Sequence, residues 1–477
     1  MGNNFKKYSL LEVYDVANGL SKSRKEFGFG YPFLSFKEVF NNYFLPNNLV
    51  NLANTTEQER KKCSIKKGDV FITRTSETFN ELGMACVALK DYPEATFNGF
   101  TKRLRPNNKV HVNPEYAGFY FQSPCFRKQV LSLTTMTTRA SLNNEMLGRL
   151  TIFLPDIDRQ EEISKILFDC HQKVENNLSI NKTLEEMAQA IFKSWFVDFD
   201  PVHVKTEAIK NGGSHDDARI AGMSVISGKT KEELASMQTE SPEDYTELAS
   251  TTDAFPSSFV ESELGLIPEG WEMKPIGDIV KAKGGYAFKS KDFHDVGHPV
   301  IKIKNITNGG KVIIDGSQCI NEEIAQKSSK FSLKDGDLIM AMTGATVCKS
   351  GIVVSYNQKL FLNQRVAKFE SDKFDSSISW FLFCLFKRAD VFSLLLSAAQ
   401  GSAQPNISST GIESVRTPIP PDEIIKLFCY KTNPFFSTLI ENEKQNHFLI
   451  KIRDTLLPKL LSGEIEVFSH QLMENLC

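Results

Sequence analysis

The sequence contains no stretch of roughly 18 uncharged apolar residues, so it predicts no membrane-spanning helix. Its first six residues, Met1-Gly2-Asn3-Asn4-Phe5-Lys6, lack the apolar run of a secretory signal and the Ser or Thr that N-myristoylation requires. The nine cysteines are scattered and never stand in Cys-x-x-Cys spacing, which favours a reducing compartment and argues against a thiolate zinc site. We therefore expect a globular protein of the cytoplasm.

Signatures of catalysis are also missing. No phosphate-binding P-loop occurs, and Phe27-Gly28-Phe29-Gly30 has neither the spacing nor the following helix of a dinucleotide-binding loop. Residues 433–436 (Asn-Pro-Phe-Phe) resemble the loop that holds a flipped adenine in amino-methyltransferases, but the second proline of that loop is absent. Pro434 is instead typical of the first turn of a helix. A single-chain methyltransferase is therefore disfavoured, and the chain is expected to bind no cofactor itself.

Metal-dependent hydrolysis lacks its residues as well. The Pro-Asp pairs at 155–156 and 421–422 could open a nuclease site, but no Glu-x-Lys follows either of them closely, and such hydrolysis needs clustered carboxylates with a cation. His294 and His298 are spaced like helical metal ligands, yet Gly297 and Pro299 make this segment a loop. We expect no metal site and no catalytic residue.

What the sequence does contain is a duplication. Tyr31–Lys37 (Tyr-Pro-Phe-Leu-Ser-Phe-Lys) is answered by His298–Lys304 (His-Pro-Val-Ile-Lys-Ile-Lys), and Lys67–Ile72 is answered by Asp335–Met340. The offset of about 267 residues is that of a duplicated domain and far exceeds a solenoid repeat. Two similar modules in one chain suggest one binding task performed at two places.

Charge is segregated along the chain. Residues 1–155 carry 21 Lys and Arg against 13 Asp and Glu, and residues 271–420 carry 19 against 14. The intervening and final segments, 156–200, 201–270 and 421–477, are all net acidic. Basic modules joined by acidic connectors are typical of a protein that binds a polyphosphate, because cations release counterions from nucleic acid. Ordinary charge scatter among segments is the alternative.

The same boundaries predict the domain organisation, an α+β protein with two similar α/β modules. Residues 70–73 and 338–341 follow Gly-Asp turns and predict short buried strands, while 379–386 predicts a core helix. Residues 1–155 and 271–420 are the modules, 156–200 and 421–477 contain long helices, and 201–270 is expected to be an irregular acidic connector.

A coiled-coil seam is predicted on both long helices. From residue 163 to about 196, apolar residues recur in 4-3 spacing over a length of about 50 Å. Each seam has two asparagines at matching places, which favours packing of the two helices on each other over packing of each on its own module. Pro458 is expected to bend or end the second helix near Ser462-Gly463. The seam residues are Val174, Asn177, Asn181, Leu184 and Ile191, with Leu439, Asn442, Asn446, Leu449 and Leu456.

Four segments resemble the specificity subunit of type I restriction-modification enzymes: Phe192–Pro201 (Phe-Lys-Ser-Trp-Phe-Val-Asp-Phe-Asp-Pro), Glu261–Trp271, Gln404–Ile407 before the prolines at 418–421, and Leu456–Gly463. The resemblance covers essentially the whole chain, and Trp-Phe-Val-Asp-Phe-Asp-Pro is its most specific part. The first copy departs from the pattern, because Ser141-Leu142-Asn143 stands where the second has Gln404-Pro405-Asn406.

The resemblance implies a non-catalytic subunit with two target recognition domains, each reading half of an asymmetric, interrupted DNA site. It also implies an antiparallel coiled-coil spacer and a pseudo-two-fold arrangement. Two methyltransferase subunits would carry S-adenosylmethionine, and two restriction subunits would use ATP and Mg²⁺. An adaptor that binds protein instead of DNA, or a single-chain methyltransferase or nuclease, are the alternatives.

Candidate DNA contacts follow from residue type, since Arg favours guanine, Asn or Gln favours adenine, and Lys mostly contacts phosphate. In the first module they are Lys22, Arg24, Lys25, Arg74, Thr75, Ser76, Lys102, Arg103, Arg105, Arg139 and Asn143. In the second they are Lys289, Lys291, Lys302, Lys304, Asn305, Thr343, Gln364, Arg365, Ser402, Gln404 and Asn406. Because the two sets differ, the modules are expected to read different half-sites.

Overall fold

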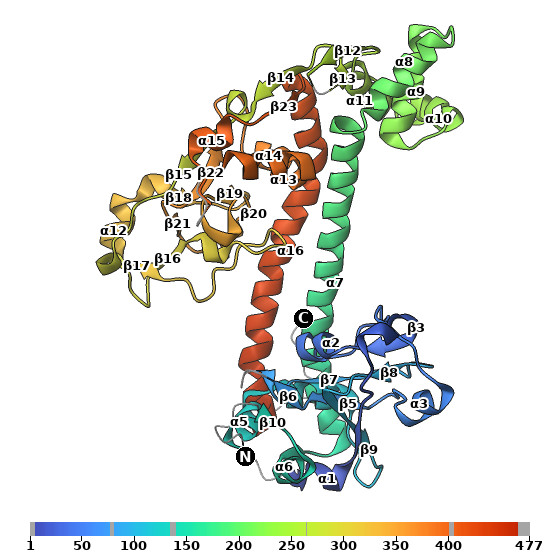
Figure 1. The fold of residues 1–477 in the computed structure, drawn as a ribbon, viewed down its shortest axis with the longest axis vertical. Coiled ribbons are helices and arrows are strands. Elements are labelled where there is room, and N and C mark those ends of the chain that lie inside the picture. Colours follow the sequence, from blue (N-terminus) through green and yellow to red (C-terminus); the bar gives the residue numbers. More distant parts are fainter. Residues whose placement is uncertain (1–4, 77–80, 134–139, 264, 400–404, 466–477) are drawn as a thin grey trace, which may run out of the picture. The chain divides into compact units, whose positions relative to one another are not determined.

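The computed structural model describes residues 5–76, 81–133, 140–263, 265–399 and 405–465 (Figure 1). The chain forms two compact units. Unit 1 comprises residues 1–175 and 448–477, and unit 2 comprises residues 176–447. Two long helices belong to both units: α7 (Ile157–Phe196) continues from unit 1 into unit 2, and α16 (Asp422–Ser462) from unit 2 into unit 1. No helix among the described residues is long and apolar enough to cross a membrane.

Unit 1 is built around an antiparallel sheet of order β2-β9-β5-β7, beside a sheet of order β4-β3-β8 and the pairs β1-β11 and β6-β10. Its elements are β1 (Lys6–Ser9), α1 (Leu10–Val13), β2 (Tyr14–Asn18), β3 (Phe27–Leu34), α2 (Phe36–Asn41), β4 (Leu52–Ala53), α3 (Glu57–Lys62), β5 (Val70–Thr73), β6 (Thr75–Ser76), β7 (Ala85–Val87), β8 (Thr96–Phe97), β9 (Thr101–Pro106), α4 (Pro114–Gln122), α5 (Pro124–Leu133), β10 (Ala140–Ser141), α6 (Asn144–Arg149) and β11 (Thr151–Leu154).

The core of unit 1 joins the N-terminal module to both long helices. Phe119 and Phe121 of α4 are fully buried against the sheet. Ile163 of α7 and Leu457 of α16 belong to the same buried cluster. The end of the chain therefore helps to close the core of its first module, with burial of each such side chain worth roughly 1.5–3 kcal/mol.

Unit 2 repeats this plan with sheets of order β15-β22-β19-β20 and β17-β16-β21-β18 and the pairs β14-β23 and β12-β13. Its elements are α8 (Asp200–Lys210), α9 (His215–Ser227), α10 (Lys231–Glu240), α11 (Pro242–Asp253), β12 (Phe259–Ser262), β13 (Gly265–Pro268), β14 (Glu272–Pro275), β15 (Lys281–Gly284), β16 (His298–Ile301), β17 (Cys319–Ile320), α12 (Glu322–Lys327), β18 (Ser332–Leu333), β19 (Leu338–Ala341), β20 (Ser350–Ile352), β21 (Leu360–Leu362), β22 (Val366–Glu370), α13 (Ile378–Lys387), α14 (Ala389–Ala398), α15 (Ser409–Glu413) and β23 (Arg416–Ile419).

The duplication seen in the sequence is thus a duplication of sheet order. β5 and β19 occupy equivalent central positions, and they coincide with the predicted strands 70–73 and 338–341. In each unit a strand pairs in parallel with a later one, β3 with β8 and β16 with β21. The predicted core helix at 379–386 is also confirmed, as α13.

Within unit 2 the two long helices contact each other through the predicted asparagines. Asn177 Nδ2 donates to Asn446 Oδ1 at 2.9 Å, and Asn442 Nδ2 donates to Asn181 Oδ1 at 2.8 Å. Moving one helical turn forward on α7 corresponds to moving one turn back on α16, so the pairing is antiparallel. The expectation that these helices pack on each other agrees with these bonds. All ten predicted seam residues are buried or half-buried.

The segment expected to be an irregular connector is folded, which corrects the sequence-based expectation. Residues 200–253 form α8 to α11, and β12 and β13 follow. The Ser, Thr and acidic residues that suggested a linker are helix caps: Ser214 and Thr230 form capping boxes with Asp217 and Glu233. Three buried side chains, Met223, Leu234 and Leu248, form a small core beneath these helices. Acidic first turns explain much of the negative charge of this segment.

One expectation about prolines was wrong, because Pro434 lies inside α16 and not in its first turn. The expected end of the second helix near Ser462 and Gly463 is confirmed, since α16 ends at Ser462 and Gly463 has a φ of 72°. An interior proline costs a helix about 3 kcal/mol or more. Tertiary packing offsets that cost here: Phe436 stacks on Trp380 with ring centroids 4.0 Å apart, and Leu460 is buried in the core of unit 1.

Candidate nucleic-acid interface

In each module the same three backbone segments meet at one end of the central sheet. In unit 1 the amide of Arg74, just after β5, donates to Phe100 O at 3.0 Å, and the amide of Leu142 donates to Arg74 O at 2.7 Å. In unit 2 Met342 N donates to Arg365 O at 3.0 Å, and Ile407 N donates to Met342 O at 2.9 Å. We call each of these arrangements a junction. The predicted contacts Arg74, Thr75, Ser76, Lys102, Thr343, Gln364, Arg365 and Asn406 lie at or beside the two junctions.

The junction of unit 1 contains a polar cluster centred on Lys102. Its Nζ donates to Asn18 Oδ1 at 3.1 Å and to Asn144 Oδ1 at 2.7 Å. Arg74 NH1 donates to the same Asn18 oxygen at 3.4 Å. Only 5% of Lys102 is exposed, and burial, with a contribution from the charge of Arg74, lowers the pKa of its ammonium group. Asn18 and Asn144 are exposed and cover it.

A turn beside this cluster projects an aromatic ring. Asn98 builds the turn, because its Oδ1 accepts from Phe100 N at 2.7 Å and its carbonyl accepts from Thr101 Oγ1 at 2.7 Å. The Phe100 side chain is 61% exposed. Sequence reasoning missed Asn18, Asn144 and Phe100, although the Asn-Gly dipeptides at 18–19 and 98–99 are turn signals that follow or precede strands.

The junction of unit 2 has the same backbone and different side chains. Thr343 and Asn406 form a β-bridge, and Thr343 Oγ1 donates to Pro405 O at 3.4 Å. Gln364, Arg365 and Asn406 are exposed there. Thr343 is buried, so its role within the described residues is to join two segments of the junction.

Several predicted contacts are engaged inside the modules. Arg103 is buried and donates to Ser64 O at 2.7 Å, and Arg105 forms an ion pair with the fully buried Asp69 at 2.6 Å. Asn305 is buried and donates to Ile313 O. Side chains alternate between the two faces of strand β9, so those of residues 103 and 105 lie on one face and that of Lys102 lies on the other. This alternation explains why both arginines bond inside the module while Lys102 lies at the junction. The placement of these three side chains favours a structural role.

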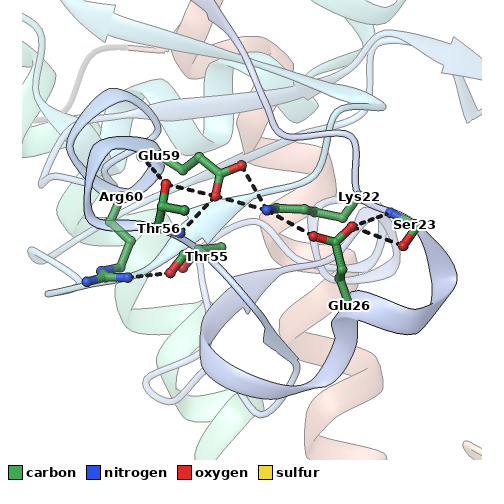
Figure 2. A network of polar contacts seen from close by, with 7 residues as sticks. All are labelled: Lys22, Ser23, Glu26, Thr55, Thr56, Glu59 and Arg60. Atoms are coloured by element: carbon green, nitrogen blue, oxygen red, sulfur yellow. Dashed lines mark hydrogen bonds and ion pairs between the residues drawn. The ribbon is translucent and has the colours of Figure 1, made fainter.

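Lys22 is also neutralised within its module, as Figure 2 shows. Its Nζ lies 2.8 Å from a carboxylate oxygen of Glu59 and 3.4 Å from one of Glu26. Those carboxylates also complete helix capping boxes with Thr56 and Ser23. The Glu59 bond is the largest cause of the raised pKa of Lys22.

The other predicted residues are further cations, Asn143, which follows Leu142 of the unit 1 junction, and three residues that lie outside the described part of the chain. Lys302 is half-buried, with its ammonium 3.5 Å from the centroid of the Phe293 ring, and Asn143 caps α6 by accepting from Met146 N. Arg24, Lys25, Lys289, Lys291 and Lys304 are exposed. Arg139, Ser402 and Gln404 are outside the part of the chain that the structure describes.

The junctions offer hydrogen-bond donors and cations at the surface of basic modules. Across the described ranges no group of three or more His, Cys, Asp or Glu residues is placed to hold a metal ion. Buried thiols are poor nucleophiles: burial raises the pKa of Cys348 to about 11 and that of Cys384 to about 12. Cations of the kind found at the junctions can contact phosphate, and amides or guanidinium groups can contact base edges.

Comparison with known proteins agrees with this description. The family described as "Type I restriction modification DNA specificity domain" matches residues 3–186 and 268–447. The specificity subunit of the type I restriction enzyme HindI from Haemophilus influenzae is 30% identical over 97% of this chain and 100% of its own length. The MjaIX specificity subunit from Methanocaldococcus jannaschii is 25% identical over 96% of this chain and 92% of its own.

The chain therefore belongs to the family of type I restriction-modification specificity subunits. A crystal structure of the S subunit of a type I restriction-modification system from M. genitalium has the same fold, with a TM-score of 0.55 at 14% identity over 96% of this chain and 97% of that one. Specificity subunits are non-catalytic DNA-recognition components of their enzymes. The expected fold class and family are both confirmed.

Proposed function

We propose that the chain recognises an asymmetric, two-part DNA site, with one half read by each module. The observation that carries this proposal is the difference between the two junctions. Lys102 pairs with Ile72, the third residue of β5, and Ala367 pairs with Met340, the third residue of β19. Lys102 and Ala367 therefore occupy equivalent register positions in the two modules. The same register makes Asn18 equivalent to Gly284, and the backbone bonds make Arg74 equivalent to Met342 and Phe100 to Arg365.

One backbone frame thus carries two unlike sets of side chains. The side chains of the unit 1 junction are cationic and rich in amides, and those of the unit 2 junction include Gln364, Arg365 and Asn406. The two sets would therefore favour different base-edge patterns. Identical half-sites would need identical reading residues. The proposal therefore specifies a site whose two halves differ in sequence.

The chemistry would belong to partner subunits. We propose that two methyltransferase subunits with S-adenosylmethionine methylate adenine at the site, and that two restriction subunits with ATP and Mg²⁺ carry out cleavage. The long helices would dock the methyltransferases and act as the spacer between half-sites. Scattered cysteines, with eight described as free thiols, are consistent with work in the cytoplasm.

The test is a map of adenine methylation in cells that carry this gene and its methyltransferase partner. Deletion of this gene should abolish one interrupted, asymmetric motif and leave other methylation unchanged. Arg74→Ala should relax base preference in one half of that motif, and Arg365→Ala in the other half. An unchanged methylome after deletion would refute the proposal. Binding of DNA without sequence preference in the assembled complex, or binding that did not weaken with salt, would favour the adaptor alternative.

A further inference from the structure

Two cationic groups, the Lys102 ammonium and the Arg74 guanidinium, make three hydrogen bonds to two carboxamide oxygens in the junction of unit 1. Asn18 Oδ1 accepts from Lys102 Nζ at 3.1 Å and from Arg74 NH1 at 3.4 Å, and Asn144 Oδ1 accepts from Lys102 Nζ at 2.7 Å. Lysine and arginine side chains have donors and no acceptors. The carboxamides must therefore turn their oxygens toward the cations.

This orientation decides what the two amides present to solvent. Both lone pairs of Asn18 Oδ1 are engaged, and Asn144 Oδ1 is turned to the same lysine. Their Nδ2 groups have no hydrogen-bond partner within the described part of the chain, and both residues are exposed. The buried Lys102 itself cannot reach a ligand without leaving the amides. The surface of this junction thus offers fixed donors, with the acceptors hidden.

We infer that Asn18 reads an acceptor edge of a base pair, that Asn144 adds a second donor, and that Lys102 is a positioning residue beneath them. Guanine fits best, because its major-groove edge presents two acceptors, N7 and O6. Asparagine usually reads adenine by donating to N7 while its oxygen accepts from N6. Asn18 cannot do this, since its oxygen is occupied. This inference rests on the proposed function, whose half-sites it makes specific.

The second module provides an internal reference. The positions equivalent to Asn18, Lys102 and Arg74 are Gly284, Ala367 and Met342, so the donor arrangement does not exist there. Changes to the Asn18 cluster should therefore alter one half of the DNA site only. Preference in the other half should be unaffected.

The experiment uses the full chain assembled with its methyltransferase partner. The half-site read by the N-terminal module is randomised in a duplex library, and the other half is kept constant. Asn18→Asp keeps an oxygen facing Lys102 and Arg74 but replaces the outward donor by an acceptor. We expect preference for guanine at one position to fall by roughly 5- to 150-fold. Asn48→Asp, at an exposed position of the same module, makes the same charge change and should leave every base preference intact.

A second variant tests the orientation without adding charge. Lys102→Met combined with Arg74→Met removes both donors that fix the carboxamides, so both amides can rotate and adenine should become acceptable at the guanine position. Thermal melting confirms that each variant is folded. The inference is overturned if Asn18→Asp only weakens binding equally for all sequences, as a phosphate repulsion would, or if the folded double variant retains strict guanine preference. A wild-type complex without sequence preference would instead refute the proposed function itself.

Discussion

The asparagine pair in the helix seam permits a quantitative test of the packing between α7 and α16. Asn177 Nδ2 donates to Gln445 Oε1 at 2.7 Å and to Asn446 Oδ1 at 2.9 Å. Asn177 is 0% and Asn446 is 3% exposed. In addition, Asn177 Oδ1 and Asn446 Nδ2 are buried without a partner. The perturbation is Asn177→Leu, alone and together with Asn446→Leu.

The single variant should be destabilised in unit 2. It leaves Asn446 Oδ1 buried and unpaired, at a cost of about 1–3 kcal/mol, whereas Asn446 Nδ2 is unpaired already in wild type. Added apolar burial by leucine offsets part of that, at most about 1.5–3 kcal/mol. The double variant removes every unpaired group and should be as stable as wild type or more stable. We therefore expect a coupling energy between the two sites of about 1–3 kcal/mol.

Tryptophan fluorescence provides a probe that is specific for unit 2. The chain has three tryptophans, Trp195, Trp271 and Trp380, and all of them are buried in one core cluster of that unit. Denaturant unfolding followed by their emission gives the free energy of unfolding of unit 2 for wild type, both single variants and the double variant. The reasoning is refuted if the two substitutions are additive within about 0.5 kcal/mol, because residues in direct contact must couple.

Three further predictions concern unit 1 and the long helix. Arg105→Met should destabilise unit 1 by about 3 kcal/mol because it leaves the Asp69 carboxylate buried without its cation. Asp69→Asn in the same chain should restore much of this stability. Amide hydrogen exchange in strand β5 measures the stability of unit 1 in both variants. Burial, with the charge of Arg453, lowers the pKa of His171 in the folded chain to about 4, whereas the pKa of histidine in an unfolded chain is about 6.5. Between these two pH values the unfolded state binds more protons than the folded state, so the free energy of unfolding should fall by about 2 kcal/mol between pH 7 and 5. This loss should vanish in His171→Gln. Insertion of one helical turn into α7 should change the spacing between half-sites or abolish binding, and unchanged recognition in a methylation map would show that the helix is not a spacer.

Local signals in the sequence were sufficient to predict secondary structure where several of them indicated the same element. Gly-Asp turns followed by apolar residues marked β5 and β19 at their observed bounds, because a turn and a buried four-residue run leave little conformational choice. The 4-3 spacing and the matched asparagines identified the two helices and their contact. The acidic segment before residue 254 was misread, since Ser, Thr and Asp serve both linkers and helix caps, and only a packed apolar core distinguishes the two.

The residues of the candidate interface could likewise be predicted only in part from the sequence. Residue type and basic charge selected Arg74 and Lys102, which meet in the junction of unit 1. They also selected Arg103 and Arg105, which bond inward to Ser64 and Asp69. Sequence could not separate these cases. The side of strand β9 on which a cation lies depends on its pairing with β5 and β2.

The sequence by itself determined the duplication, the α+β class, the seam of the long helices and the family, because these depend on periodicity and on motifs within short stretches. Only the tertiary structure decided which polar groups are hidden and which are presented. Asn18, Arg74, Lys102 and Asn144 come from four separate segments, and their meeting is set by sheet register. Hydrogen-bond direction at such a meeting point is a property of all four side chains together, so no single segment could reveal it.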